Sequence, residues 1–127
     1  ARRIVPLNVS GPFHSQMLQE AGEKLAQVLS EVPVQEIRTP YITNVTADYV
    51  TDRDEVKGLL ARQVSSSVKW QQSVERMLAD GVNTFVEIGP GRTLSGFLRK
   101  IDRSATGIQI EKLEDLEKAA SMLLEQE

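Results

Sequence analysis

Apolar residues recur along much of the 127-residue chain at spacings of three and four, the period of one face of an α-helix. The segments with this spacing are 14–32, 56–64, 70–78, 94–101 and 113–123. The stripe of the first segment is His14, Leu18, Ala21, Leu25, Val28 and Val32, and that of the last is Leu113, Leu116, Ala120 and Leu123. Gly81 follows the segment 70–78 at a position where a glycine can cap a helix C-terminus. Short runs rich in apolar or β-branched residues predict strands at 2–9, 41–45, 83–89 and 105–110. Because strands alternate with helices, the pattern predicts an α/β fold with a mainly parallel sheet.

The first helical segment opens on the only histidine of the chain, His14, within "VSGPFHSQML". Its place at the head of an apolar stripe favours a ring at the edge of the core that bonds a backbone group. A second interpretation is that a helix N-terminus disfavours the imidazolium, so that a neutral ring can accept a proton. The pattern alone leaves both open.

Gln63 interrupts the apolar stripe of the segment 56–64. A buried amide must find hydrogen-bond partners or cost about 1–3 kcal/mol. One interpretation is an amide that bonds a neighbouring strand or loop. The other is that this helix end orients a second polar group, and His14 is the neutral base that the chain offers. The spacing does not show that the two residues meet.

Composition removes several classes of function. The chain has no cysteine, which excludes disulfides, thiolate metal sites and cysteine nucleophiles, and one histidine cannot build a histidine-rich metal cluster. A net charge of −3 argues against nucleic-acid binding. No apolar run approaches the roughly 20 residues of a membrane span, so we expect no membrane segment and a cytoplasmic protein. The chain begins at Ala1 in a strand-like run, which suggests a piece of a longer protein.

Two further features, a glycine-rich turn and a cluster of basic residues, could bind an anion or an acidic partner. The stretch "EIGPGRTL" at 87–94 is a strand, a glycine-rich turn and a helix start, where backbone amides can bind an anion. It lacks the nucleotide-binding spacings of glycine, so a packing turn is favoured. Arg99, Lys100 and Arg103 cluster near the end of the following helix, where the helix dipole favours cations and an acidic partner could bind.

The segments "PLNVSGPFHSQML" and "LLARQVSSSVKWQQSVERMLADGVNTFVEIGPGRTLSGFLRKI", in this order, resemble the C-terminal part of malonyl-CoA:acyl carrier protein transacylases. The resemblance extends from about residue 3 to residue 124. It implies an α/β-hydrolase-like large acyltransferase subdomain with a parallel sheet, into which a ferredoxin-like small subdomain is inserted. Residues 1–9 would be the last strand of the small subdomain, and residues 10–127 the C-terminal part of the large one.

The resemblance also implies an activity, the transfer of malonyl from malonyl-CoA to the phosphopantetheine thiol of acyl carrier protein in fatty-acid biosynthesis, without a bound cofactor or metal. His14 matches the base of a Ser-His ping-pong mechanism, and Gln63 the residue whose backbone carbonyl accepts a hydrogen bond from that imidazole. Phe13 matches a residue that shapes the acyl pocket and favours malonyl. We expect Arg99, Lys100 and Arg103 to dock the carrier protein.

The chain lacks the front half of such an enzyme. It has no G-x-S-x-G elbow, and the serine, the arginine that pairs with the malonyl carboxylate and the glutamine loop of the oxyanion hole would precede Ala1. We therefore expect the chain alone to be inactive and to associate with the N-terminal portion of the enzyme. The alternatives are an acyltransferase segment of a polyketide or fatty-acid megasynthase, and a non-catalytic fragment that binds a carrier or an anion.

Overall fold

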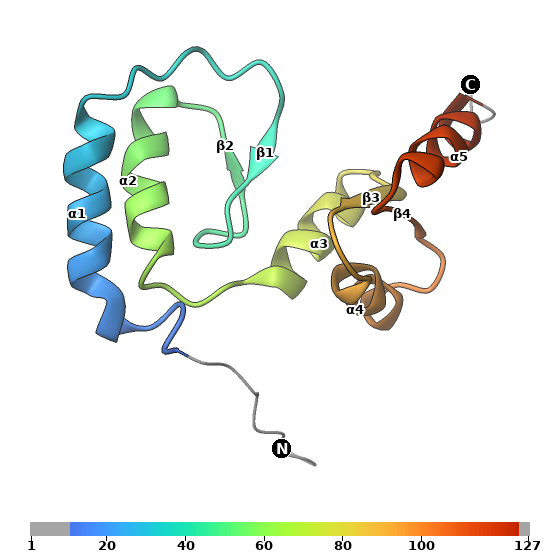
Figure 1. Ribbon diagram of the computed structural model, residues 1–127, viewed down its shortest axis with the longest axis horizontal. Helices are drawn as coiled ribbons and strands as arrows, with labels where there is room; N and C mark the ends of the chain where they lie inside the picture. Colours follow the sequence, from blue (N-terminus) through green and yellow to red (C-terminus); the bar gives the residue numbers. More distant parts are fainter. Residues whose placement is uncertain (1–10, 125–127) are drawn as a thin grey trace. The chain divides into compact units, whose positions relative to one another are not determined.

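The structure is a computed structural model that describes residues 11–124 (Figure 1). The predicted strand at 2–9, and with it the predicted boundary after residue 9, lies outside these residues. The elements are η1 (Gln16–Leu18), α1 (Gln19–Ser30), β1 (Tyr41–Ile42), β2 (Tyr49–Val50), α2 (Arg53–Gln63), α3 (Trp70–Ala79), β3 (Thr84–Ile88), α4 (Thr93–Ile101), β4 (Thr106–Ile110) and α5 (Leu113–Leu124). The α/β class is confirmed. The chain divides into two compact units, 1–73 and 74–127, each described below by itself.

In the first unit α1 and α2 lie side by side and run in opposite directions (Figure 1). They meet at Gly22, which is buried on α1. A Cβ atom at Gly22 would lie 2.8 Å from the backbone oxygen of Ala61 on α2, closer than such atoms can approach. The missing side chain therefore allows the two helix backbones to pack directly against each other.

The buried face of α1 differs from the predicted stripe. Ala21, Val28 and Val32 were expected to point inward, but Ala21 is exposed and the side chains of Val28 and Val32 are 65% and 42% exposed. Two members of the predicted stripe, Leu18 and Leu25, are half-buried, and they share the inner face with the buried Gly22 and the half-buried Leu29. The rest of the prediction was wrong because it gave no weight to a glycine, which buries no side chain and yet sets the face that contacts α2.

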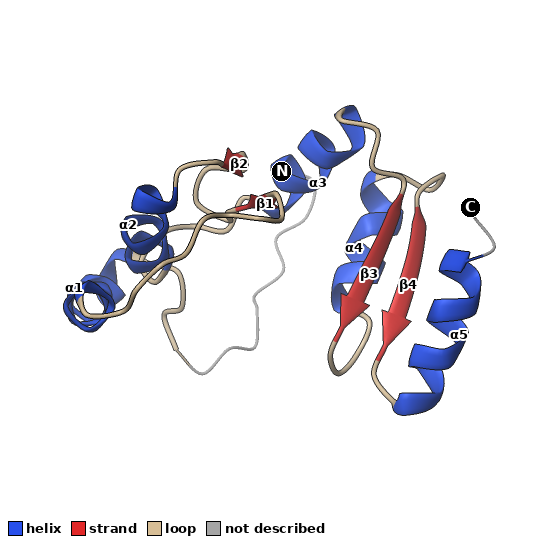
Figure 2. Ribbon diagram, turned by 90° about the horizontal axis from the view of Figure 1, so that it is seen from above, coloured by secondary structure: helices blue, strands red, loops and turns tan. Residues whose placement is uncertain are grey.

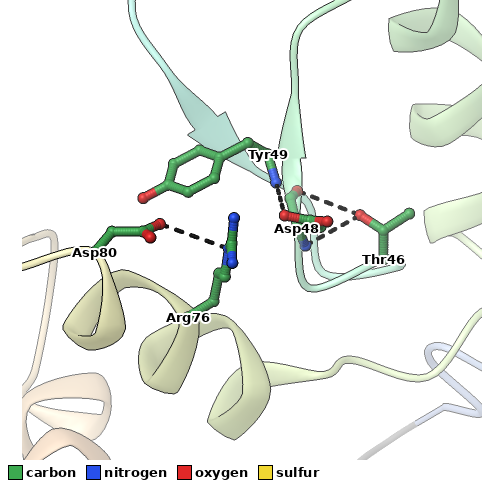
Figure 3. A network of polar contacts seen from close by, with 5 residues as sticks. All are labelled: Thr46, Asp48, Tyr49, Arg76 and Asp80. Atoms are coloured by element: carbon green, nitrogen blue, oxygen red, sulfur yellow. Dashed lines mark hydrogen bonds and ion pairs between the residues drawn. The ribbon is translucent and has the colours of Figure 1, made fainter.

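In the sequence between α1 and α2, a two-stranded antiparallel hairpin pairs Tyr41 with Val50 and Ile42 with Tyr49. The strand predicted at 41–45 is therefore shorter than expected, and β2 was not predicted. Side chains bond the loop of the hairpin: Thr46 Oγ1 contacts both the backbone N and O of Asp48 at 3.3 Å, and the Asp48 carboxylate accepts from the backbone N of Tyr49 at 2.8 Å (Figure 3).

Helix α3 ends at a glycine, as the sequence predicts. Gly81 has φ +89°, a left-handed conformation that glycine adopts without strain. The backbone N of Gly81 donates to the oxygen of Leu78 and that of Val82 to the oxygen of Met77, which together form a Schellman cap. An ion pair of 3.5 Å between Arg76 and Asp80 joins the last turn to the residue that follows it (Figure 3).

In the second unit β3 and β4 form a parallel pair with Thr84 opposite Thr106 and Ile88 opposite Ile110 (Figure 2). The predicted parallel pairing is confirmed, with α4 as the crossover helix. Leu98 of α4 is buried and would contact a Cβ atom at Gly107 of β4 at 3.4 Å, so α4 packs on the face of the sheet that carries Glu87 and Gly107. Helix α5 packs against β4.

Few apolar side chains of the described residues are buried: Val45, Val50, Val74, Leu98, Ile108 and Ala119. The stripe predicted to face the core on α5 is largely exposed, with Leu113 at 76%, Leu116 at 50% and Leu123 at 42%. Ala119 is the buried residue of α5, so the inward face was predicted wrongly. Helix α5 thus carries apolar side chains that the second unit does not cover.

Candidate functional site

The structure brings His14 and Gln63 together within the first unit. The Nδ1 atom of His14 lies 3.0 Å from the backbone oxygen of Gln63, although the two residues are 49 positions apart. A carbonyl oxygen can only accept, so this contact assigns the imidazole proton to Nδ1. In a neutral ring Nε2 is then the atom with a free lone pair, which can accept a proton from a nearby group.

The antiparallel pairing of α1 and α2 explains why these residues meet. His14 precedes the start of α1, and Gln63 is the last residue of α2. At the other end of the helix pair, Lys57 Nζ donates to the backbone oxygen of Ser30 at 3.1 Å. The close approach at Gly22 lies between these two contacts. The helix pair thus holds the end of α2 beside the histidine.

His14 does not sit where the apolar pattern placed it. It precedes the short 3₁₀ turn η1, α1 begins only at Gln19, and the residue is exposed with φ +55°. The predicted place at the edge of the core is therefore wrong, whereas the predicted bond to a backbone group is confirmed by the Gln63 oxygen. A helix does begin beside the ring, because Ser15 is the N-cap of η1, which continues directly into α1, and its hydroxyl donates to the oxygen of Pro12 at 2.7 Å. The helix-dipole interpretation stays a prediction.

Apolar side chains flank the histidine in sequence and are exposed. Phe13 is 64% exposed, with its ring over Gly11, and Met17 is 80% exposed. The described part of the chain covers neither side chain. Of these two residues, the sequence singled out Phe13, whose role at the acyl pocket stays a prediction.

The turn "EIGPGRTL" is a packing device. Glu87 on β3 accepts hydrogen bonds from the backbone N of Leu94 at 3.1 Å and of Ser95 at 2.8 Å, and from Ser95 Oγ at 2.5 Å. The hydroxyl and amide of Ser95 hold the pKa of Glu87 below its ordinary value. The amides that an anion would need at this helix start are therefore used by a carboxylate of the chain itself, which counts against the anion-binding alternative for this turn.

A second side chain fixes the same turn. Gln109 Nε2 on β4 donates to the backbone oxygens of Gly89 at 2.8 Å and Gly91 at 2.7 Å. Gly89 and Gly91 have φ +144° and +84°, values that only glycine adopts readily. Adjacent strands thus bond the turn from both sides.

Arg99, Lys100 and Arg103 lie together, as the sequence suggests. They line a hollow of about 630 Å³ whose other residues are Gly96, Ala105 and Gly107. All three basic residues are exposed, and Lys100 Nζ lies 6.0 Å from the centre of the Phe97 ring. The neighbouring carboxylate of Asp102 accepts from the backbone N and Oγ of Ser104 at 2.7 and 2.6 Å. The hollow is therefore a cationic surface.

Residues 11–124 contain neither a candidate metal site nor a helix that could span a membrane. Over that range no group of three or more histidine and carboxylate side chains could hold a metal ion. None of the helices described above is long and apolar enough to cross a membrane.

Comparison with known proteins gives a consistent result. No protein-family model matches the chain. The malonyl CoA-acyl carrier protein transacylase of Bacillus subtilis is 40% identical over 126 residues, which are 99% of this chain and 40% of that protein. The crystal structure of the transacylase of the same name from Clostridium perfringens superposes with a TM-score of 0.87 at 39% identity, over 96% of this chain and 39% of that one.

A third match is a malonyl-transacylase in complex with its type II polyketide synthase acyl-carrier protein. It has a TM-score of 0.84 and 30% identity, over 91% of this chain and 37% of that one. In class, the chain is thus an α/β protein related to acyl-transferring enzymes. Its homologues are the malonyl CoA-acyl carrier protein transacylases, so the resemblance drawn from the sequence is confirmed. The chain spans about 40% of the length of the curated relatives it matches.

Proposed function

We propose that this chain is the C-terminal part of a malonyl-CoA:acyl carrier protein transacylase and supplies the base of its Ser-His mechanism. The support is homology to transacylases over 99% of the chain, together with the contact of 3.0 Å between His14 Nδ1 and the Gln63 oxygen. The contact carries the proposal, because it leaves Nε2 of a neutral imidazole free to accept a proton.

In the proposed loading step, a serine from the rest of the enzyme gives its hydroxyl proton to His14 Nε2 and attacks the thioester carbonyl of malonyl-CoA. The carbon–sulfur bond breaks, and the departing coenzyme A sulfur takes the proton from Nε2. In the transfer step the phosphopantetheine thiol of acyl carrier protein gives its proton to Nε2 and attacks the malonyl ester. The carbon–oxygen bond breaks, and the serine oxygen recovers the proton. No resident cofactor takes part.

Gln63 acts in this proposal through its backbone. When Nε2 gains a proton the ring becomes cationic, and the carbonyl at Nδ1 stabilises that charge and fixes the orientation of the ring. Phe13, exposed beside His14, would shape the acyl pocket and favour malonyl.

The carrier protein is proposed to dock on the cationic surface of Arg99, Lys100 and Arg103. The support is the clustering of the three charges around one hollow. A structural relative is a transacylase in complex with an acyl-carrier protein, which makes a carrier a reasonable partner for this chain too. Charged residues at such a surface raise the rate of association more than they add contact energy.

We also propose that residues 10–127 belong to an α/β-hydrolase-like large subdomain and residues 1–9 to a ferredoxin-like small one. The N-terminal portion of the enzyme would then provide the serine, the oxyanion hole and the arginine for the malonyl carboxylate.

The experiment compares full-length protein with the chain 1–127 in both half-reactions. Full-length protein should form a covalent malonyl-enzyme from malonyl-CoA and pass malonyl to holo acyl carrier protein. The isolated chain should do neither. Absence of a malonyl-enzyme in the full-length protein, or malonyl transfer by the isolated chain, would contradict the proposal.

A further inference from the structure

His14 lies inside a short loop of the backbone that a side chain closes. Its φ is +55°, a left-handed value that residues other than glycine adopt only where neighbouring contacts hold them. Around it, the hydroxyl of Ser15 donates to the backbone oxygen of Pro12 at 2.7 Å. This bond closes the segment 12–15, so the backbone of the histidine is confined by a contact that its own side chain does not make.

Ser15 uses its hydroxyl differently from most serines at its position. It is the N-cap of η1, where a serine hydroxyl commonly accepts from an amide of the first helical turn. No such bond forms here, because the hydroxyl donates back to the loop instead. The backbone oxygen of Ser15 accepts from the N of Leu18 at 3.0 Å, and the residue is half-buried between exposed neighbours. Ser15 thus joins the loop of the histidine to η1, which continues into the helix that packs against α2.

We propose that Ser15 is a positioning residue for the reaction, whose hydroxyl holds the left-handed backbone of His14 and thereby keeps the imidazole at the carbonyl of Gln63. The ring reaches that carbonyl at 3.0 Å through Nδ1. A side chain occupies only a few staggered rotamers, so the backbone conformation decides which positions the ring can reach. A backbone that relaxes to a negative φ takes the ring away from the carbonyl. The proton is then no longer assigned to Nδ1, and Nε2 is a free acceptor in only part of the molecules.

The effect on catalysis rests on the proposed function, because Ser15 acts on the reaction only through His14. The hold on the ring does not depend on the activity. In both proposed half-reactions the same Nε2 accepts and returns the proton, so a displaced ring should slow both. It should leave KM for malonyl-CoA nearly unchanged, because Ser15 itself contacts no substrate in this proposal.

Three variants of the full-length protein separate the hydroxyl from the rest of the side chain: Ser15→Ala, Ser15→Thr and Ser30→Ala. Alanine removes the hydroxyl of Ser15, whereas threonine keeps it on an extended backbone, with φ −129° and ψ 163°, that a β-branched residue adopts readily. Ser30→Ala is the matched control. The hydroxyl of Ser30 also donates to the oxygen three residues earlier, that of Gln27 at 2.6 Å, but at the other end of α1.

The ¹⁵N signals of the histidine rings, at a pH at which the rings are neutral, report the tautomer, and the signals that disappear in His14→Ala belong to His14. Ser15→Ala should turn the Nδ1–H ring of wild type into a mixture with the Nε2–H form. It should also lower kcat for malonyl transfer by about 10-fold or more, with KM for malonyl-CoA within about twofold of wild type. Ser15→Thr should restore both properties, and Ser30→Ala should change neither.

An unchanged tautomer in Ser15→Ala would overturn the inference whatever the rate, and so would an equal loss in Ser15→Thr or in Ser30→Ala. If the tautomer shifts while kcat does not, malonyl transfer by His14→Ala decides between the two proposals. An active His14→Ala then overturns the proposed function and leaves the hold of Ser15 on the ring in place. An inactive His14→Ala overturns the positioning role of Ser15 and leaves the proposed function in place.

Discussion

Glu87 and Ser95 join a strand to the helix that follows it. The carboxylate of Glu87 lies 2.8 Å from the backbone N of Ser95 and 2.5 Å from its hydroxyl, and it also accepts from the backbone N of Leu94. A carboxylate at a helix start satisfies amides that have no partner within the helix and interacts favourably with the helix dipole. The Glu87 carboxylate thus binds the backbone amides at this helix start that could otherwise bind an external anion.

Replacement of this carboxylate should show a defined pH dependence. The hydrogen bonds from Ser95 lower the pKa of Glu87 from its ordinary value of 4.5, so its stabilisation is present above the unfolded-state pKa and is lost as the pH falls through the lower folded-state pKa. Glu87→Gln should lower the melting temperature by a few degrees above about pH 5, and the difference should shrink below about pH 4. Thermal scans of both proteins across this range measure it. A difference independent of pH would contradict the assignment.

Gln63 should tolerate loss of its side chain. The bond to His14 uses the backbone oxygen, which Gln63→Ala retains, so malonyl transfer by the full-length variant should stay within about threefold of wild type. The chain 1–127 has a single histidine, so the ¹⁵N signals of its ring report the protonated nitrogen directly. They should show the Nδ1–H form with and without the glutamine side chain. A large loss of activity, or the Nε2–H form, would count against the role of the carbonyl.

Charge reversal in the cationic surface should separate the two half-reactions. Arg99→Glu with Arg103→Glu should lower kcat/KM for the carrier protein by about 10-fold or more at low salt, and high salt should reduce the difference. Loading from malonyl-CoA should be largely unchanged. Lys24→Glu with Arg38→Glu, two exposed residues of the other unit, is the charge-matched control. Equal losses in both half-reactions would show that the surface does not serve the carrier alone.

The conformation of the glycine that follows α3 predicts an effect of its substitution on stability. Gly81 has φ +89°, and a Cβ atom there would meet nothing within 4 Å, so only backbone strain opposes a side chain. Gly81→Ala should lower the free energy of unfolding by about 1 kcal/mol. Gly58, in the middle of α2, also has open space around a Cβ atom and is the control, since alanine there should be stabilising. Denaturant unfolding distinguishes the two, and a neutral Gly81→Ala would contradict the cap.

The sequence predicted local elements well and burial poorly. The parallel pair β3 and β4 and the cap at Gly81 follow from short-range signals, namely strand propensity and glycine placement. The inward face of α1 was predicted only in part, because Gly22 received no weight. That of α5 was predicted wrongly, because the rule that apolar stripes face a core assumes that the core lies within the described chain. Leu113 at 76% exposed and Ile88 at 79% exposed show apolar residues that their own unit does not cover.

The apolar periodicity of the sequence did not predict the candidate site. Spacing placed His14 on a helical stripe, whereas the structure places it before a 3₁₀ turn with φ +55°. Its partner is a backbone oxygen, and a side-chain pattern carries no information about which carbonyl a folded chain presents. The order of the motifs gave the pairing of His14 with Gln63, and the packing of α1 against α2 supplies its physical cause.

The most direct test of the central claim is the rate of malonyl transfer by full-length His14→Ala, with Gln63→Ala measured beside it. If His14 is the base, His14→Ala should lower kcat for transfer from malonyl-CoA to acyl carrier protein by about 10³-fold or more, while the glutamine variant stays close to wild type. Transfer by His14→Ala at the rate of the glutamine variant would contradict the account.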